Sequence, residues 1–460
     1  MKLPQAFIDS LVQLGPDAGT LADALADTSP SVAVRVNKGK GIAVPAGSDT
    51  VPWCPDAFYL DRRPLFAADP AWHQGLYYVQ DASSMAVGTV VATLAREYLG
   101  NEPLLVLDAC AAPGGKSIAY LDTLPSDTLL VANEYDRQRA AVLADNIAAW
   151  GNPRVVVTNA DARQYAALGE FFDIVAADMP CSGEGMMRKE EAAVAQWSPG
   201  LIASCADIQF DIALALWQAL RPGGILIYST CTFNLAENEQ NIRRIISHTG
   251  AQLLDIPLHG HGIADGVGMP EARRFYPGRV RGEGLFIAAL RKPEGPAKTP
   301  RLGKPKAEKS SPRLILSPDD YLYIKTDSAD GPLSVALPAA RAATMWTIMS
   351  RFRTLHAGVP LVIEKGRNII PVHRLAMSVV LDPDAYPAGN LDYPSALAYL
   401  AGEAPVPADV PKGIYAPSWH GRPLGWAKNI GNRANTLMPA HLRLRLRRDT
   451  LTTPPSIIKE

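Results

Sequence analysis

The chain has 460 residues, a formal net charge of −1, 47% hydrophobic residues and 20% charged residues. This length predicts about two to four domains, and the composition is typical of a soluble globular protein. The balanced charge does not by itself indicate a nucleic-acid-binding protein. No stretch approaches the roughly 20 apolar residues of a membrane span, and the N-terminus lacks a secretory signal. We therefore expect a cytoplasmic monomer with no membrane partner.

The cysteines show neither C-x-x-C spacing nor a Cys/His pattern typical of zinc sites. We therefore expect free thiols, and neither a disulfide framework nor a metal site. The five cysteines are Cys54, Cys110, Cys181, Cys205 and Cys231.

Residues 1–75 are predicted to form a small mixed α+β domain. Amphipathic patterns indicate helices near residues 5–14 and 20–25, and a strand over 32–37 follows. Arg35 and Asn37 lie near the end of that strand. The pattern leaves open whether they contact RNA or are solvated surface groups.

Residues 76–292 alternate between strand-like and helical patterns, which is typical of a doubly wound α/β domain. Helices are expected at 136–150, at 201–220 and at 237–248, the second closed by the turn Pro222-Gly223-Gly224. The apolar runs predict a mostly parallel, buried sheet. The expected strands are 104–107, 128–134, 154–161, 172–178, 224–231 and 284–290.

Residues 293–313 are rich in Pro, Lys and Ser and read as a basic linker, which can attract a phosphate backbone or simply be solvated. Globular patterns return in 314–394 and 395–460, with strands near 321–325 and 360–365 and a helix near 395–403. Leu and Arg alternate close to the end of the chain, which predicts a strand with one basic face. Phosphate contact is favoured there over a merely solvated face. The basic residues of this alternation are Arg443, Arg445, Arg447 and Arg448.

The segment LLVLDACAAPGGKS, residues 104–117, combines a strand, a glycine turn and a helix start. Glycine lets the backbone approach a ligand, and the N–H groups at a helix N-terminus attract its polar or negative parts. A P-loop would need glycine where Cys110 stands, and the dinucleotide fingerprint G-x-G-x-x-G is also absent. The segment therefore predicts a nucleotide-type cradle whose ligand stays open.

Carboxylates end four consecutive predicted strands: Asp108, Glu134, Asp161 and Asp178. Ligands bind at this edge of a doubly wound sheet. Glu134 is placed to bond ribose hydroxyls and Asp161 to bond an adenine amino group. Each carboxylate can also cap a helix, but four in register favour a ligand site.

Cys181 and Cys231 follow two strands that are expected to be neighbours, so both thiols should reach one crevice. A thiol pair beside a nucleoside cofactor suggests methylation of carbon 5 of a pyrimidine, because a thiolate that adds to carbon 6 activates carbon 5. A base must then remove the carbon 5 proton, and Asp178 could bond the pyrimidine edge. Cys54 and Cys205 fit buried structural thiols better. Spacing does not choose between the two crevice thiols.

The motifs LDACAAPGGKS, ADMPCSGEGMMRK and YSTCTFNLAENE, in this order, resemble the signature set of the RNA cytosine-carbon-5 methyltransferases of the Nop/Sun family. LYYVQDASSM (76–85) and RFYPGRVRGEGLFIAALRK (274–292) resemble further motifs of these enzymes. PLGWAKNIGNRANTLMP (423–439) resembles the bacterial RsmF-type members. Those members act on small-subunit ribosomal RNA and carry a PUA-like RNA-binding module.

The resemblance implies a Rossmann-like class I methyltransferase core with a seven-stranded, mostly parallel sheet in 76–292, an N-terminal accessory domain in 1–75, and C-terminal accessory and PUA-like regions in 314–394 and 395–460. It implies Cys231 as the nucleophile, Cys181 as the group that assists product release, and Asp178 at the interface of cofactor and base. Glu134 would contact the ribose and Asp161 the adenine. The rest of the S-adenosylmethionine pocket would be Cys110, Ala111, Ala112, Pro113, Gly114, Gly115 and Lys116.

The substrate implied by the resemblance is ribosomal RNA or the small ribosomal subunit, with transfer RNA as the less favoured partner. A non-catalytic RNA-binding assembly factor is the rival interpretation. The presence of both thiols and of all four carboxylates argues against it.

Overall fold

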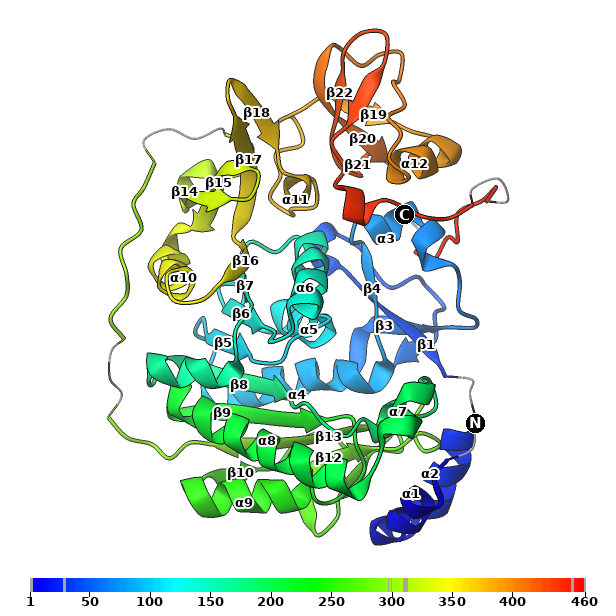
Figure 1. Ribbon diagram of the computed structural model, residues 1–460, viewed down its shortest axis with the longest axis vertical. Helices are drawn as coiled ribbons and strands as arrows, with labels where there is room; N and C mark the ends of the chain where they lie inside the picture. The colour runs from blue at the N-terminus through cyan, green and yellow to red at the C-terminus, as the bar shows by residue number, and fades with distance from the viewer. Residues whose placement is uncertain are drawn as a thin grey trace.

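The structure is a computed structural model that describes residues 3–27, 30–296, 298, 300–308, 313–447 and 451–458. In this described part, the largest sheet has ten strands in the order β11-β12-β13-β9-β8-β5-β6-β7-β16, with β10 paired to β13 (Figure 1). The strands are β5 (Leu105–Asp108), β6 (Leu129–Asn133), β7 (Val155–Thr158), β8 (Phe172–Asp178), β9 (Leu220–Thr230), β10 (Gln252–Leu254), β11 (Ala264–Gly266), β12 (Met269–Phe275), β13 (Leu285–Arg291) and β16 (Thr354–Ala357).

Strands β9, β8, β5, β6 and β7 run parallel, whereas β10 to β13 and β16 add antiparallel pairs. The predicted Rossmann-like core is therefore confirmed, but the sheet is mixed and exceeds the expected seven strands. The additional strands β10, β11 and β12 are short or partly polar, so their hydropathy pattern is weak. Strand β16 comes from the C-terminal part of the chain.

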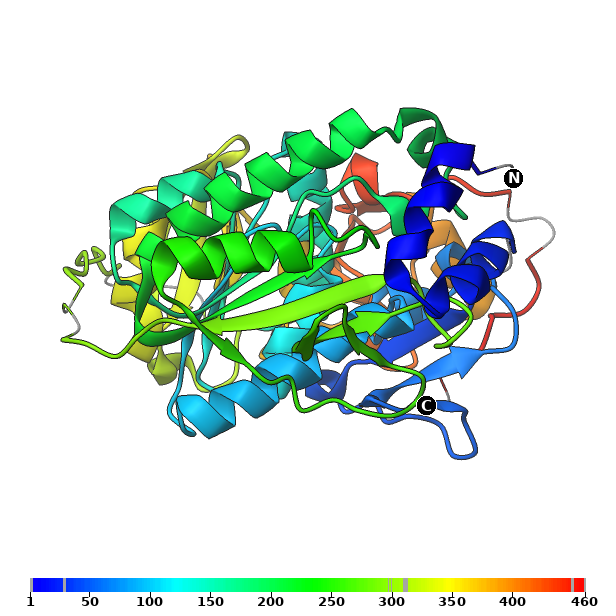
Figure 2. The same cartoon turned by 90° about the horizontal axis from the view of Figure 1, so that it is seen from below.

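Alternate residues of the parallel strands face two separate cores, as the period of two requires. Val106 and Ile174 pack toward one side, and Leu107 and Val175 toward the other. Figure 2 shows the green helices α8 and α9 on one side of the sheet and the light-blue helix α4 on the other. The helices of these layers are α4 (Ala82–Tyr98), α5 (Gly115–Thr123) and α6 (Arg137–Trp150) on one side, and α8 (Pro199–Ala219) and α9 (Glu239–Thr249) on the other.

Helix α8 ends at Ala219, and the chain passes directly into β9. The Pro222-Gly223-Gly224 turn predicted to close the helix instead lies inside the first part of that strand, where Gly224 approaches the Asp173 carbonyl too closely for any side chain. Among the described helices, α8 alone is long and apolar enough, by length and composition, to cross a membrane. Its residues Ala213 and Leu216 are buried against the sheet, which is the position of a core helix.

The N-terminal region contributes a second sheet and two helices that pack elsewhere. Its four-stranded sheet has the order β2-β3-β1-β4. Helices α1 and α2 instead share a core with Met187 and Phe233 of the central region. The elements are α1 (Gln5–Ser10), α2 (Asp17–Ala26), β1 (Val32–Val36), β2 (Thr50–Val51), β3 (Cys54–Leu60), α3 (Pro70–His73) and β4 (Tyr77–Val79).

Arg35 and Asn37 are buried, so both readings of them, as RNA contacts and as solvated groups, are wrong. The Asn37 amide donates to the carbonyls of Gly75 and Trp150, at 2.9 and 3.0 Å. A guanidinium nitrogen of Arg35 lies 3.7 Å from an Asp122 carboxylate oxygen. These side chains join the N-terminal sheet to the central domain, a role that depends on partners far away in the sequence.

Two smaller sheets follow in the C-terminal part, in the orders β14-β15-β17-β18 and β19-β20-β22-β23. Residues 300–308 contain neither helix nor strand, yet Gly303 N–H donates to the Thr347 hydroxyl at 2.8 Å. Lys309 of the predicted linker lies outside the described residues. The C-terminal elements are β14 (Tyr321–Ser328), β15 (Gly331–Pro338), α10 (Ala342–Met349), β17 (Val359–Lys365), β18 (Asn368–Pro371), α11 (His373–Ala376), β19 (Ala388–Asn390), α12 (Tyr393–Leu400), β20 (Gly413–Trp419), β21 (Arg422–Pro423), β22 (Ala427–Asn429) and β23 (Ala434–Thr436).

The strand predicted from the alternating Leu and Arg residues is wrong for the described positions. A short 3₁₀ helix, Ala440–Leu442, is followed by irregular chain. Leu444 is buried and its N–H donates to the carbonyl of Leu400 in α12, while Arg443 donates to the Met438 carbonyl. The alternation thus produces a buried Leu without a strand, because the segment packs on a helix rather than on a sheet edge. Arg448 lies outside the described residues.

Candidate active site

The loop between β5 and α5 surrounds a cavity of about 170 Å³. Gly114 has φ +117°, which disfavours any side chain, and a Cβ at Gly115 would lie 3.1 Å from the Gln80 side chain. Burial raises the pKa of the Cys110 thiol, which suits a neutral residue of the wall. The cavity is lined by Cys110, Ala111, Ala112, Pro113, Gly115, Lys116 and Asp178, together with Tyr78, Val79, Gln80, Asp81 and Ser84.

Side chains of α6 hold this loop from behind. Arg139 donates to the carbonyl of Ala112 at 3.0 Å, and Asn146 donates to that of Pro113 at 2.8 Å. Asp108, at the end of β5, is buried and accepts a hydrogen bond of 2.6 Å from the Ser117 hydroxyl. Burial raises the pKa of Asp108 to about 7. Asp108 therefore joins the strand to α5 and does not line the cavity.

Glu134 and Asp161 do not line this cavity either. Glu134 is buried after β6 and accepts from the Asp136 N–H at 3.0 Å. Asp161 caps a short 3₁₀ helix by accepting from the Arg163 N–H, and hydrogen bonds from the Arg163 side chain hold the pKa of Asp161 below its ordinary value. The loop residues and Asp178 therefore line one cavity. Glu134 and Asp161 lie outside it, after the neighbouring strands β6 and β7.

The two crevice thiols lie in contact, with 3.4 Å between the Sγ atoms of Cys181 and Cys231. Each follows one of the parallel neighbours β8 and β9, so the predicted proximity is confirmed. The hydrogen bond to Cys231, aided by burial, raises the pKa of Cys181. Cys181 therefore remains protonated and can donate toward the Cys231 sulfur. Cys54 and Cys205 are buried, as expected.

Asp178 connects the thiol pair to the loop. One of its carboxylate oxygens accepts from the Ser229 hydroxyl at 2.8 Å, and the other lies 2.8 Å from the Lys116 ammonium. Burial disfavours the charge of Lys116, but the attraction of Asp178 outweighs it and raises the pKa of Lys116. Lys116 is thus a permanent cation beside Asp178, an ion pair that sequence reasoning missed.

Glu184, which follows Cys181 on the same loop, binds the loop that carries Cys231. One of its oxygens accepts from the Thr232 hydroxyl at 2.6 Å and from the N–H groups of Phe233 and Asn234 at 2.7 and 2.9 Å. Glu184 is buried. A Cβ at Gly185 would lie 2.5 Å from the Cys231 carbonyl, so glycine is required for this close approach.

Glu237 makes the reciprocal connection from the second loop to the first. It accepts from Ser182 N–H at 3.0 Å and from Gln209 at 2.7 Å, and the Ser182 hydroxyl also donates to it. We call Glu184 and Glu237 the carboxylate clamp, because each holds the loop that bears the other. In the sequence, the signal that could have predicted this clamp is the acidic residue in each of CSGEG and NLAENE, shortly after a buried strand.

Three parts of the chain match known protein families. Residues 98–291 match 16S rRNA methyltransferase RsmB/F, residues 3–82 match the N-terminal domain of 16S rRNA methyltransferase RsmF, and residues 388–444 match the methyltransferase RsmF PUA domain.

Relatives extend this similarity over nearly the whole chain. The ribosomal RNA small subunit methyltransferase F of Pectobacterium carotovorum is 31% identical over 96% of each chain. That of Serratia proteamaculans is 30% identical over 86% of this chain and 84% of the relative. The crystal structure of NSun6 from Pyrococcus horikoshii with SFG has a TM-score of 0.52 and 21% identity over 64% of this chain and 99% of that one, which is a likeness of fold. The chain therefore belongs to the RsmF-type family of ribosomal RNA small subunit methyltransferases.

Proposed function

We propose that this protein forms 5-methylcytosine in small-subunit ribosomal RNA, with S-adenosylmethionine as the methyl donor and a covalent cysteine adduct as the intermediate. The observation that carries the proposal is the thiol pair, 3.4 Å apart, beside Asp178 and the small-residue loop. Two thiols next to a nucleotide-type cradle suit the activation of a pyrimidine carbon, which is a poor nucleophile without such help.

The cofactor fits the residues present. The cavity of the loop leaves room for a ligand against residues 110–113, 115 and 116. Cys110 to Lys116 would hold S-adenosylmethionine, with Glu134 on its ribose and Asp161 near its adenine. When bound there, it would supply an electrophilic methyl group. NSun6 from Pyrococcus horikoshii, which is similar in fold, was solved with SFG, and this supports a bound ligand in a protein of this fold.

In the proposed reaction Cys231 is the nucleophile. Addition of its sulfur to carbon 6 of cytosine makes carbon 5 enamine-like, and Asp178 bonds the pyrimidine edge to stabilise the protonated adduct. After carbon 5 is methylated, loss of its proton to a base returns the electron pair that expels the Cys231 thiolate. Cys181, held protonated in contact with Cys231, assists this release of the product.

The RNA partner is proposed from the C-terminal module and from the names of the relatives. Residues 388–444 match an RsmF PUA domain, and the relatives are named for the small ribosomal subunit. We propose ribosomal RNA over transfer RNA, and the division of the chain into 1–75, 76–292, 293–313, 314–394 and 395–460.

The test combines two cysteine variants with mapping of the product. Cys231→Ala is expected to abolish methylation, whereas Cys181→Ala should accumulate a covalent protein–RNA adduct on denaturing gels. Cys205→Ala is the matched control, because this thiol is buried in α8. Undiminished 5-methylcytosine formation by Cys231→Ala would overturn the assignment of the nucleophile.

Bisulfite mapping of total RNA from cells with and without the gene tests the substrate. The proposal expects one or more 16S cytosines to lose their methyl group when the gene is absent. Loss of 5-methylcytosine from transfer RNA alone would show that the substrate is transfer RNA instead. No change in any RNA would favour a non-catalytic assembly factor.

A further inference from the structure

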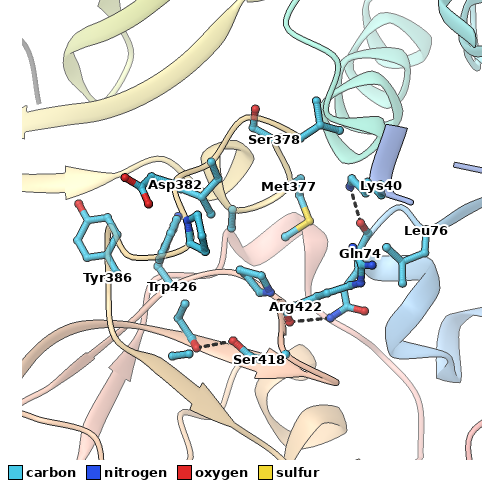
Figure 3. A pocket seen from close by; sticks show the side chains of 18 of the residues that line it. Lys40, Gln74, Leu76, Met377, Ser378, Asp382, Tyr386, Ser418, Arg422 and Trp426 are labelled. Carbon is cyan, nitrogen blue, oxygen red and sulfur yellow. Dashed lines mark hydrogen bonds between the residues drawn. The ribbon is translucent and has the colours of Figure 1, made fainter. Parts of the chain in front are cut away.

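A second cavity, of about 330 Å³, lies where the N-terminal region meets residues 376–388 and the strands β20 and β21 (Figure 3). It shares no lining residue with the cavity beside the thiols. Its volume is within the range of small-ligand sites. Three parts of the chain that are distant in sequence build it, so we call it the junction pocket.

One side of the junction pocket carries two basic side chains, Lys40 and Arg422, with Gln74 beside them (Figure 3). The Lys40 ammonium donates to the carbonyls of Gln74 and Ala149, both at 2.6 Å, which fixes its position. In the described ranges of the chain, neither Lys40 nor Arg422 is ion-paired with a carboxylate. The charge of Arg422 disfavours the protonated form of the nearby Lys40, and a bound anion would relieve this repulsion.

The electrostatics agree with this geometry. Burial, followed by the charge of Arg422, lowers the pKa of Lys40 to about 7. Gln74 is buried and donates to the carbonyls of Trp419 and Arg422, at 3.0 and 2.7 Å. Its own side-chain oxygen has no hydrogen-bond partner among the described residues. A buried acceptor without a partner is uncommon in folded proteins, and this one belongs to a side chain that lines the pocket.

The other side of the pocket is aromatic and acidic (Figure 3). The rings of Tyr386 and Trp426 lie with their centroids 4.8 Å apart, and Met377 adds a polarisable apolar surface. The Trp426 ring is fixed because its N–H donates to the Val372 carbonyl at 2.9 Å. Asp382 lies on this side, where its carboxylate can accept from an amino group.

We propose that the junction pocket binds one nucleotide of the RNA substrate, with its phosphate at Lys40 and Arg422 and an amino-bearing base against Tyr386, whose ring is backed by the buried Trp426. Arg binds phosphate with paired N–H groups, and aromatic rings bind splayed-out bases of single-stranded RNA. Asp382 would accept from the exocyclic amine and favour cytosine or adenine over uracil. The inference rests on the proposed function in that the substrate is RNA. It adds a second nucleotide site, separate from the one where methylation occurs.

The test measures binding of the full-length protein to fluorescent single-stranded RNA by anisotropy, without cofactor. Arg422→Gln is expected to weaken binding about ten-fold or more, while Arg367→Gln, which removes an exposed charge outside the pocket, should change it less than about two-fold. Asp382→Asn should reduce the preference for cytosine- and adenine-containing RNA over poly-uridine and leave poly-uridine binding unchanged. Thermal unfolding of each variant shows whether it is folded.

Competition distinguishes the source of the nucleotide. The proposal expects excess RNA, but not 5′-CMP or inorganic phosphate at equal nucleotide concentration, to displace the labelled RNA. Equal losses in Arg422→Gln and Arg367→Gln would overturn it, as would a pocket that binds 5′-CMP and is indifferent to RNA. Ultraviolet cross-linking of cytosine-containing single-stranded RNA should label the peptide that spans 376–388, and labelling elsewhere only would also overturn it.

Failure of this inference can be separated from failure of the proposed function. If Arg422→Gln leaves the KM for RNA unchanged in an enzyme that makes 5-methylcytosine, the assignment of the junction pocket to RNA is wrong and the proposed activity stands. If RNA binding depends on Arg422 but no RNA is methylated, the activity is wrong and the pocket stands.

Discussion

At the scale of single residues, Asp178 is the connection on which the site depends. Its carboxylate meets the Lys116 ammonium on the loop and the Ser229 hydroxyl at the end of β9. Asp161, by contrast, is engaged with its own 3₁₀ helix and Arg163. The proposed roles of these two carboxylates therefore make different kinetic predictions.

Asp178→Asn should lower kcat by about 10²-fold or more, because the group that stabilises the protonated adduct is lost and Lys116 is left unpaired. Asp161→Asn should mainly raise the KM for S-adenosylmethionine. Steady-state kinetics on a ribosomal RNA fragment separate the two effects. An Asp178→Asn enzyme with normal kcat would remove this residue from the chemistry.

His356 makes stability depend on pH. The side chain is buried in β16, its Nδ1 atom has no hydrogen-bond partner among the described residues, and burial, with the charge of Arg374, lowers its pKa to about 3. The unfolded chain binds a proton near pH 6.5, so the free energy of unfolding should fall as pH drops below 6.5 and continue to fall toward pH 3.

At pH 5, His356 should lower the free energy of unfolding by about 2 kcal/mol relative to its value at pH 7. Urea unfolding at both values, compared between the native chain and His356→Gln, measures that contribution. An equal loss of stability in both proteins would assign the pH dependence to other groups.

At the scale of elements, the carboxylate clamp explains how two separate loops hold their thiols in contact. Glu184 and Glu237 are buried, and each accepts hydrogen bonds from the loop that bears the other. Backbone N–H groups at the ends of β8 and β9 would otherwise be unsatisfied, which costs about 1–3 kcal/mol for each buried group.

Glu184→Ala should destabilise the fold by about 3 kcal/mol or more, since four donors, from Trp197, Thr232, Phe233 and Asn234, lose their acceptor. In a Cys181→Ala background, the same change should slow adduct formation with RNA because Cys231 loses its fixed position. Glu190→Ala, an exposed residue of the same segment, serves as the control. Equal rates of adduct formation in both variants would show that Glu184 does not control the position of Cys231.

At the scale of the whole molecule, the part of the chain after residue 313 packs into the same structure as the central sheet and the N-terminal sheet. Strand β16 pairs antiparallel with β7, and Met345 and Ile348 of α10 pack in the same core as the parallel strands. Ile457 and Ile458 lie in the core of the N-terminal sheet. The residues after the linker 293–313 are therefore joined to the rest of the chain by shared hydrophobic cores as well as by the linker.

A chain cut after residue 296 should be poorly soluble and melt at a lower temperature than the full protein, because it exposes the edge of β7 and the surface under α10. A chain cut after residue 386 retains β16 and should keep more of its thermal stability. Soluble yield and thermal unfolding of both fragments test this. A stable, monomeric 1–296 fragment would show that β16 is dispensable.

The sequence by itself determined the parallel centre of the sheet, the small-residue loop after β5 and the meeting of Cys181 with Cys231, because apolar runs, glycine turns and strand ends are local signals. Only the tertiary structure decided the Lys116–Asp178 ion pair, the carboxylate clamp, the burial of Arg35 and Asn37, and the membership of β16 in the central sheet. It also decided that the Leu and Arg alternation packs on α12 rather than forming a strand. These features depend on partners brought together from distant parts of the chain, and a local pattern carries no information about which partner a polar side chain or a strand edge will meet.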